Sequence, residues 1–225
     1  MNYNITLKEV YDILNSSNEI IDRYKKIENQ EILDGRWAFH NYEHVKNVTK
    51  LAEKILIDLK LDEDTICACK IACLLHDVGA LQSKEGHAER SYEYSKKLFE
   101  ENNWIFKYSN NILNAIRNHS SGFETDDIIS LSVIFADKLE IKKTRFTEAG
   151  LKIIGNRQYG HIEDITLDIN NNFLKISFIT DGMIDMDEVN NFYFTAKLFK
   201  AVEAFSKKMN LKYEILMDGK VWNLD

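Results

Sequence analysis

Proline is absent from this chain of 225 residues, although about a dozen would be usual at this length. Its absence excludes cis-prolyl turns, which other residues almost never form. Cysteine is also scarce, since the chain has only Cys67, Cys69 and Cys73. An odd number of thiols so close together fits neither a disulfide framework nor a familiar zinc motif. We therefore interpret the three cysteines as small buried side chains.

An excess of positive charge and a long apolar run are missing as well. Lys and Arg number 29 against 36 Asp and Glu, which gives a formal net charge of −7. A general nucleic-acid-binding surface would need a basic footprint instead. No apolar run is long enough to span a bilayer, and residues 1–9 do not resemble a signal peptide. We expect a cytoplasmic protein that binds neither a membrane nor a nucleic-acid polymer.

What the sequence does contain is a helix that is apolar on almost every face, at residues 66–73. A helix of this kind lies inside a domain. We expect it to cover about residues 63–78, with acidic residues in its first turn, where the helix dipole favours them. His76 and Asp77 then lie at its carboxyl end, and Gly79 just beyond is expected to form a left-handed cap. Because a buried Asp is rare unless it is paired or binds a metal, this pair predicts a metal site.

Apolar positions at helical spacing predict that most of the remaining chain is helical as well. Thr6 and Glu9 fit a capping box at the start of the first helix. Asn41 is a plausible N-cap for a helix whose apolar stripe includes His44. Further helices are expected at about residues 18–27, from residue 87, at 104–119, and from Thr125 to about 140.

The pattern changes to strict alternation from about residue 163 onward. Alternation on both sides of Asn170–Asn172 predicts a β-hairpin. A helix over about residues 186–209, a short strand at 213–217 and a turn at 218–219 are expected to follow. The predicted fold is therefore mainly α, with a helical body at residues 1–160 and a small α+β appendage at 161–225 packed on it.

Six residues with metal-binding side chains lie on inward helix faces or at predicted helix ends. Imidazoles and carboxylates without thiolates suit Fe, Mn, Co, Ni or Zn. The set is too large for one tetrahedral ion, but two divalent ions bridged by one carboxylate would use all of it. Its members are His44, His76, Asp77, His87, His119 and Asp137.

In order and helical context, these residues resemble the HD-domain superfamily of metal-dependent phosphohydrolases. The matching segments are residues 39–44, 74–79, 87–91, 116–119 and 136–140. The resemblance implies a helical HD-domain bundle and a metal held by His44, His76, Asp77 and Asp137.

His87 and His119 resemble two further histidines of the binuclear subgroup, where they complete a second metal site with Asp77 as the bridge. That subgroup includes the bacterial symmetrical diadenosine tetraphosphate hydrolases. This chain departs from several binuclear members at Ala80, where they have a lysine, and from the tetraphosphate hydrolases in its appendage after residue 160.

The resemblance implies hydrolysis of a phosphate ester or anhydride of a nucleotide-like small molecule by a metal-activated water. Asp77, His87 and His119 are then the expected catalytic residues. Cationic side chains near the motifs are candidates for binding the substrate phosphate. They are Arg90, Lys143, Lys84 and Arg145, with Lys138 as a further possibility.

Two alternative functions remain open. Some HD proteins with a similar binuclear site are diiron oxygenases that cleave C–C or C–P bonds. A non-catalytic sensor that only binds metal or ligand is the other alternative, although a complete ligand set argues against it.

The remaining chemically interesting residues have simpler interpretations. We expect His40 to support the start of its helix or a ligand, Glu140 to form a structural pair and His161 to be a loop residue. The hairpin and the last helix are expected to serve packing or a homodimer contact. We therefore interpret the aromatic side chains of that helix as core residues: Phe192, Tyr193, Phe194 and Phe199.

Overall fold

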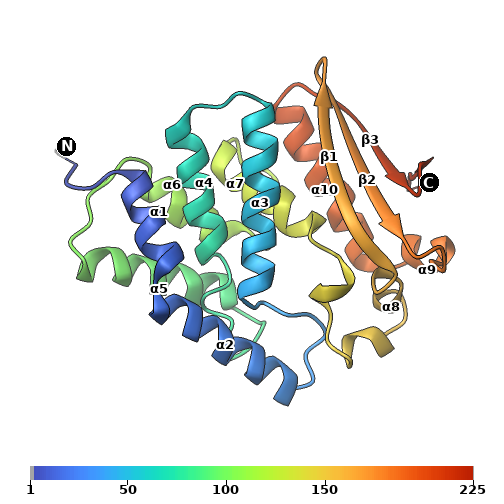
Figure 1. Cartoon of the computed structure of the whole chain (residues 1–225), viewed down its shortest axis with the longest axis horizontal. Helices are drawn as coiled ribbons and strands as arrows, with labels where there is room; N and C mark the ends of the chain where they lie inside the picture. Colours follow the sequence, from blue (N-terminus) through green and yellow to red (C-terminus); the bar gives the residue numbers. More distant parts are fainter. Residues whose placement is uncertain (1–2, 225) are drawn as a thin grey trace.

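Helix α4 (Glu63–Leu75) runs through the middle of the helical bundle, as Figure 1 shows. The computed structural model describes residues 3–224 of the chain. Nine of the 13 residues of α4 are buried, and it packs against α1 (Leu7–Ser16), α3 (Tyr42–Asp58), α6 (Ser109–Asn118) and α7 (Ile128–Leu139). The predicted interior helix is therefore confirmed, and its three cysteines are buried free thiols.

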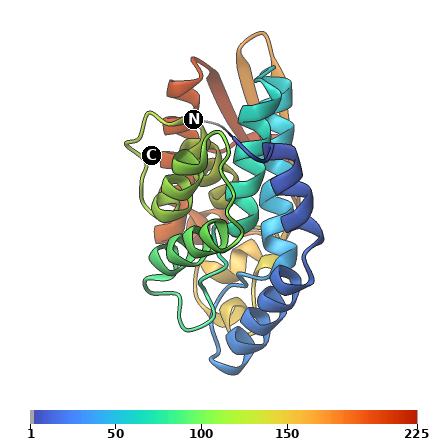
Figure 2. The same ribbon diagram turned by 90° about the vertical axis from the view of Figure 1, so that its left-hand side faces the viewer.

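The other helices surround α4. Helix α1 begins with the predicted capping box, in which the side chains of Thr6 and Glu9 each accept a hydrogen bond from the backbone N–H of the other residue. Helix α2 (Asn18–Leu33) extends beyond residue 27, where the sequence pattern predicted its end. Figure 2 shows α1 and α2 in blue on one side of the bundle and α5 (His87–Glu101) and α6 in green on the other.

The carboxyl end of α4 differs from the prediction in one important detail. The helix ends at Leu75, and Gly79 does not have the positive φ of a left-handed cap. The glycine is required for another reason, because a Cβ there would lie 2.3 Å from the backbone nitrogen of Ser91. Its small size lets the turn after Asp77 pack directly on the first turn of α5.

Two other helix starts were wrong. Helix α6 begins at Ser109 instead of residue 104, because Asn103 and Tyr108 have positive φ and interrupt the chain. Helix α7 is capped by Asp127, whose carboxylate accepts from the backbone N–H of Ser130. Thr125 caps nothing in α7, and its hydroxyl accepts from the backbone N–H of Asp127 instead.

The appendage contains the predicted hairpin and two features that the sequence did not indicate. Strands β1 (Ile162–Asn170) and β2 (Phe173–Thr180) are antiparallel, and both asparagines of their turn have positive φ. Strand β3 (Lys212–Met217) is parallel to β2 and antiparallel to the short β4 (Lys220–Val221). The predicted last helix is divided into α9 (Met186–Asn190) and α10 (Tyr193–Lys208), because Phe192 adopts an extended conformation between them.

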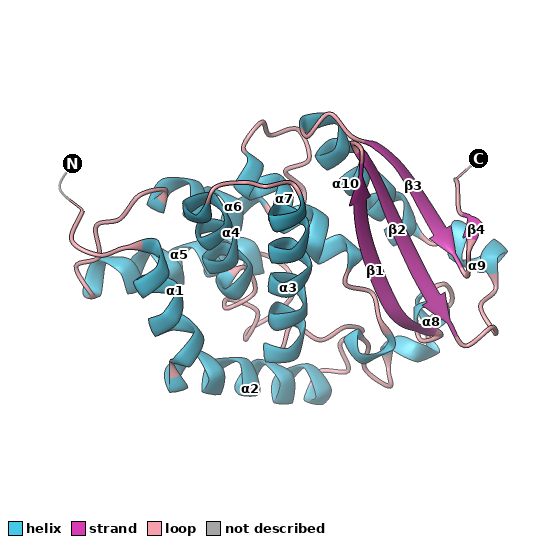
Figure 3. Ribbon diagram, turned by 45° about the horizontal axis from the view of Figure 1, so that its top comes forward, coloured by secondary structure: helices cyan, strands magenta, loops and turns pink. Residues whose placement is uncertain are grey.

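The sheet and α10 lie on one side of the helical bundle, as Figure 3 shows. Strand β1 packs against α3 and helix α10 against α7, where the rings of Phe135 and Phe205 stack with centroids 4.4 Å apart. The mainly α fold with an α+β appendage is confirmed, and its division into domains at residue 160 stays a prediction. Within residues 3–224, none of the helices has the length and hydropathy needed to cross a membrane.

The segment between α7 and β1 returns to the start of α3. It contains the short helices η1 (Lys143–Arg145), η2 (Gly150–Lys152) and α8 (Asn156–Tyr159). The backbone N–H of Phe39 donates to the carbonyl oxygen of Arg145 at 2.8 Å, and Ala38 forms a β-bridge with Phe146. These contacts place Arg145 beside the segment that carries His40.

Candidate metal centre

The six candidate ligands converge from the ends of five helices. His44 lies in the first turn of α3, which Asn41 caps through the backbone N–H of His44. His76 is the C-cap of α4 and His119 is the C-cap of α6. The others are Asp77, His87 at the start of α5, and Asp137 in the last turn of α7.

Asp77 is fully buried and lies at the centre of this cluster. Its Oδ2 is 3.4 Å from Nε2 of His44 and 3.2 Å from Nε2 of His76. Its Oδ1 is 3.1 Å from Nε2 of His87 and 3.4 Å from Nε2 of His119. Each carboxylate oxygen therefore faces its own pair of imidazoles.

Asp137 joins only one of the two pairs through close contacts. Its Oδ1 lies 3.2 Å from Nε2 of His44 and 3.7 Å from Nε2 of His76. Its Oδ2 accepts a hydrogen bond of 2.5 Å from Nζ of Lys138. One oxygen of Asp137 is thus left for the cluster while the other is held by a lysine.

The outer nitrogen of each ligand histidine is fixed by an acceptor. Nδ1 of His76, His87 and His119 donates to the backbone carbonyl oxygens of Cys73, Lys84 and Ile116, at 2.7, 2.6 and 2.8 Å. Because carbonyl oxygens only accept, the proton of a neutral ring lies on Nδ1 and the lone pair of Nε2 points into the cluster.

His44 is held in the same way by a carboxylate, since its Nδ1 lies 2.8 Å from Oε2 of Glu140. Such partners behind the ring orient histidines that bind metals. Glu140 is buried and also accepts from Nδ2 of Asn47, so the expected structural pair lies directly behind a ligand.

Most of the inward-facing atoms have no hydrogen-bond partner in the protein, and Nε2 of His119 has only the hydroxyl of Ser120 at 3.3 Å. Nε2 of His44, Nε2 of His76 and both carboxylate oxygens of Asp77 are buried without a hydrogen bond. Nε2 of His87 and Nε2 of His119 lie 2.9 Å apart, where two lone pairs repel each other. Unpaired buried polar groups are costly. Divalent cations would satisfy these nitrogen and oxygen atoms, because a cation accepts their lone pairs. The residues present therefore fit a metal.

The electrostatics of the cluster lead to the same requirement. Burial lowers the pKa of His76, but the facing carboxylates of Asp77 and Asp137 outweigh burial and raise it to about 10. At His119 burial prevails, and its pKa falls to about 4. Burial raises the pKa of Asp77, yet the neighbouring histidines, His76 first, hold it well below its usual value. The buried carboxylates therefore favour a positive charge inside the cluster; without an ion a proton on His76 supplies it, and a metal ion would take its place.

Among residues 3–224, three overlapping groups of side chains are close enough to hold an ion. One contains His44, His76 and Asp77, another contains His76, His119 and Asp137, and the third contains His40, Asp77 and His87. Comparison with protein families matches residues 41–142 to the HD domain. These residues form an HD domain. No curated protein matches the chain.

The match to the HD domain indicates what kind of function the His/Asp cluster serves. The family implies a metal-dependent hydrolase type of function, with a divalent metal at the His/Asp cluster. The matched residues include every one of the six candidate ligands, from the N-cap of α3 to the segment after α7. The fold expected from the resemblance is confirmed, and the diadenosine tetraphosphate hydrolase subgroup stays a prediction.

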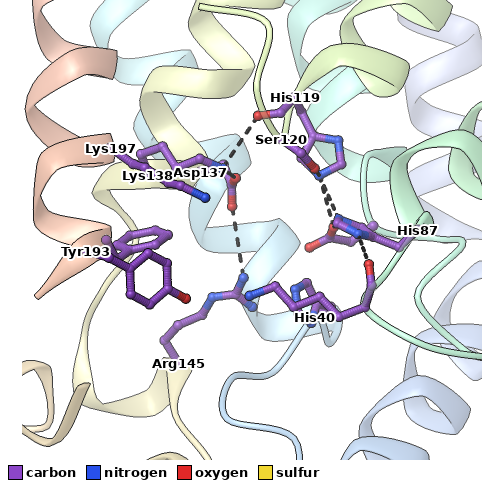
Figure 4. Close-up of a pocket in the computed structure, with 12 residues that line it drawn as sticks. His40, His87, His119, Ser120, Asp137, Lys138, Arg145, Tyr193 and Lys197 are labelled. Carbon is purple, nitrogen blue, oxygen red and sulfur yellow. Dashed lines mark hydrogen bonds and ion pairs between the residues drawn. The ribbon is translucent and has the colours of Figure 1, made fainter. Parts of the chain in front are cut away.

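A pocket of about 90 Å³ opens onto the cluster, and Figure 4 shows its lining. Lys84 and Arg145, two of the predicted phosphate-binding residues, line it together with Lys138. Burial and the nearby cations lower the pKa of Lys84. Nη2 of Arg145 lies 4.0 Å from Oδ1 of Asp137. The lining of the pocket is therefore rich in cationic side chains.

The other two predicted phosphate-binding residues do not reach this pocket. Arg90 donates through Nε to the carbonyl oxygen of Gly79 and through Nη1 to that of Glu85, and it also binds Ser83. Its guanidinium therefore fixes the loop before α5. Lys143 is half-exposed and its Nζ lies 3.3 Å from Oε1 of Glu163.

His40 lies closer to the cluster than a simple helix-start residue. It lines the pocket, and the centroid of its ring is 5.4 Å from that of His87. Its Nδ1 lies 2.6 Å from Oε1 of Glu31, a buried carboxyl whose pKa burial raises to about 7. His161, by contrast, is remote and faces Asp181 at 3.0 Å.

The main surprise in the pocket comes from α10. Tyr193, Phe194 and Lys197 line the pocket beside Asp137 and Arg145. The sequence interpretation treated the two aromatic residues as core and did not consider Lys197. The only signal that could have found them is the aromatic run at residues 192–194 together with a lysine one helical turn later, a pattern that is common in ordinary amphipathic helices.

Proposed function

We propose that the protein is a phosphohydrolase that holds two divalent ions and hydrolyses a nucleotide or another small phosphate ester or anhydride. The observation that carries the proposal is the placement of Asp77 between two pairs of imidazoles. One pair, His44 and His76, shares Asp137, and the other pair is His87 and His119. A bridging carboxylate with separate ligands on each side is the arrangement expected of a two-metal site.

Divalent ions in such a site supply Lewis-acid activation of a water molecule and neutralise negative charge on phosphate oxygens. The protein contributes the remaining positive charge. Lys84, Lys138 and Arg145 line the pocket, and cations placed there stabilise the charge that develops on a phosphoryl group. This cationic wall favours a substrate that carries a phosphate or a similar anionic group.

The fixed ring nitrogens also have a role in the proposed reaction. Because Nδ1 of each ligand histidine is held by a carbonyl or a carboxylate, the rings cannot rotate away from the pocket. His40 is held in the same way by Glu31 and borders the pocket without belonging to the six ligands. We therefore assign His40 to the contact with the substrate.

The test is a screen of nucleotides and phosphate esters against metal-free protein with Mn, Fe, Co, Ni or Zn added separately. We expect phosphate release with at least one metal. Asp77→Asn should lower turnover by about a thousandfold or more, since it removes charge from both proposed ion sites. The exposed Asp164→Asn in β1 is the matched control. Turnover that needs oxygen, without phosphate release, would instead identify an oxygenase, and metal binding without any turnover would identify a sensor.

A further inference from the structure

A helix of the appendage forms one wall of the pocket. The first turns of α10 bring Tyr193, Phe194 and Lys197 to it, and Figure 4 shows Tyr193 and Lys197 beside Asp137 and Arg145. Tyr193 is half-exposed, with an exposed fraction of 51%. A ligand that enters from solvent can therefore contact its ring without displacing the core.

Arg145 lies beside this wall in the pocket lining and has hydrogen-bonding capacity to spare. Its side chain is 10% exposed, and its Nη1 is buried without a hydrogen-bond partner. Its closest carboxylate contact is the 4.0 Å approach to Asp137, which is longer than a hydrogen bond. A buried guanidinium N–H without an acceptor is costly, so this group suits an acceptor atom of a ligand.

A second cavity of about 50 Å³ continues from the metal pocket and has a different chemistry. Both cavities are lined by His40, Lys84, Arg145, Tyr193 and Phe194, so they adjoin at these residues. The rest of the second lining is largely aromatic and includes Trp37, Phe146, Tyr159 and Phe192. A water-sized probe needs roughly 10–15 Å³, so this cavity has room for one small flat group.

We propose that α10 determines substrate selectivity, with Tyr193 and Phe194 holding a flat ring of the substrate and Arg145 and Lys197 binding an oxygen of its phosphate. The preferred substrate is then a phosphate ester that carries a flat ring close to the phosphorus. Aromatic faces attract such rings by offset or edge-to-face packing. This inference rests on the proposed phosphohydrolase function and assigns the appendage a part in the active site.

The test measures binding of two phosphonates that differ only in the ring, phenylphosphonate and methylphosphonate, by calorimetry on the full chain loaded with Mn²⁺. We expect phenylphosphonate to bind about tenfold more tightly. Tyr193→Ala should reduce this ratio to about threefold or less. Lys197→Gln should weaken both ligands by the same factor, because it contacts the shared phosphonate group.

Tyr213→Ala is the matched control, since Tyr213 is a partly exposed tyrosine of β3 that lies outside both cavities. It should keep the wild-type ratio. Equal affinities in the wild type, or a ratio that Tyr193→Ala leaves intact, would overturn the inference, whereas phosphate release in the substrate screen would still support the phosphohydrolase. If neither phosphonate binds and the substrate screen releases no phosphate, both proposals fail.

Discussion

The two sides of the pocket are held in place in different ways. On the side of residues 41–142, the cluster is buried and each ligand histidine is fixed at its outer nitrogen. On the side of α10, Tyr193 and Lys197 reach the pocket from a helix surface, and Tyr193 is half-exposed. The side chains of the metal-binding side are therefore held in place, whereas substitutions at the exposed positions of α10 should cost little stability. Under the two proposals above, the first side determines the reaction and the second the selectivity.

This difference between the two sides of the pocket does not imply that the two parts of the chain fold separately. Phe205 of α10 is fully buried, and its ring stacks on Phe135 of α7. We expect Phe205→Ala to lower the free energy of unfolding by about 3–5 kcal/mol, because it removes a large buried side chain. Both parts should unfold in one transition, with loss of helical circular dichroism and of tertiary signal at the same denaturant concentration.

Phe173→Ala is the control for this change, because Phe173 is 39% exposed at the start of β2, and its loss should cost much less. Two separate transitions, with the stability of the helical part unaltered in Phe205→Ala, would show that the boundary predicted at residue 160 divides independent units. That result would sharpen the contrast between the two sides into a true domain division.

The same contrast explains what could be predicted from the sequence. His44, His76 and Asp77 lie on apolar helices or at their ends, and a buried carboxylate has few explanations other than a pair or a metal. Local periodicity was therefore enough to bring the candidate ligands together. Tyr193 and Lys197 carry no such signal, because an aromatic residue and a lysine are ordinary on a helix surface. Their role depends on how α10 packs against α7, which is a tertiary contact.

Arg90 is an example of the opposite kind, because the sequence indicated it as a phosphate-binding residue but it does not line the pocket. It lies three residues after His87 in the sequence, which made it an attractive phosphate ligand. All of its donor groups instead bind carbonyl and hydroxyl oxygens of residues 79–85. Those acceptors belong to a loop whose conformation depends on the close packing of Gly79, so helical periodicity could not indicate them.

That close packing gives the next prediction, which concerns the metal-binding side. A Cβ on Gly79 would lie 2.6 Å from the carbonyl carbon of Arg90 and 2.7 Å from the carbonyl oxygen of His87. Gly79→Ala must therefore move the first turn of α5, and overpacking of this kind costs about 1–3 kcal/mol. Because His87 moves with that turn, affinity for Mn²⁺ should fall about 10- to 100-fold, as it does when groups that orient a ligand are altered. A metal titration followed by calorimetry measures this.

Gly182→Ala separates the two effects. Gly182 has a φ of +82° and nothing within 4 Å of the added Cβ, so alanine there costs about 1–2 kcal/mol of backbone strain without touching the cluster. It should leave Mn²⁺ affinity at the wild-type value. Wild-type affinity in Gly79→Ala would mean that the turn is less rigid than its packing indicates.

The smallest expected effect on stability concerns the surface ion pair between Glu188 and Arg157, close to the start of α10. Glu188 of α9 accepts from the backbone N–H of Gly155 at 2.7 Å and from Nε of Arg157 at 2.8 Å. These hydrogen bonds, that to Arg157 first, lower the pKa of Glu188 to about 2. Since the folded pKa is below the ordinary value, the stabilisation is complete above about pH 4.5 and is lost as the pH falls towards 2.

Glu188→Gln should therefore be less stable than the wild type at pH 7, and the difference should shrink at pH 3 because the wild-type carboxylate itself loses its advantage. Urea unfolding at the two pH values measures the difference. Asp187→Asn removes the same charge from the same helix turn without breaking the contacts to Gly155 and Arg157, so any general effect of charge appears in both variants. If Glu188→Gln lost the same unfolding free energy at both pH values, the stabilisation would come from the shape of the side chain. The contribution of the carboxylate charge would instead decrease as the pH falls.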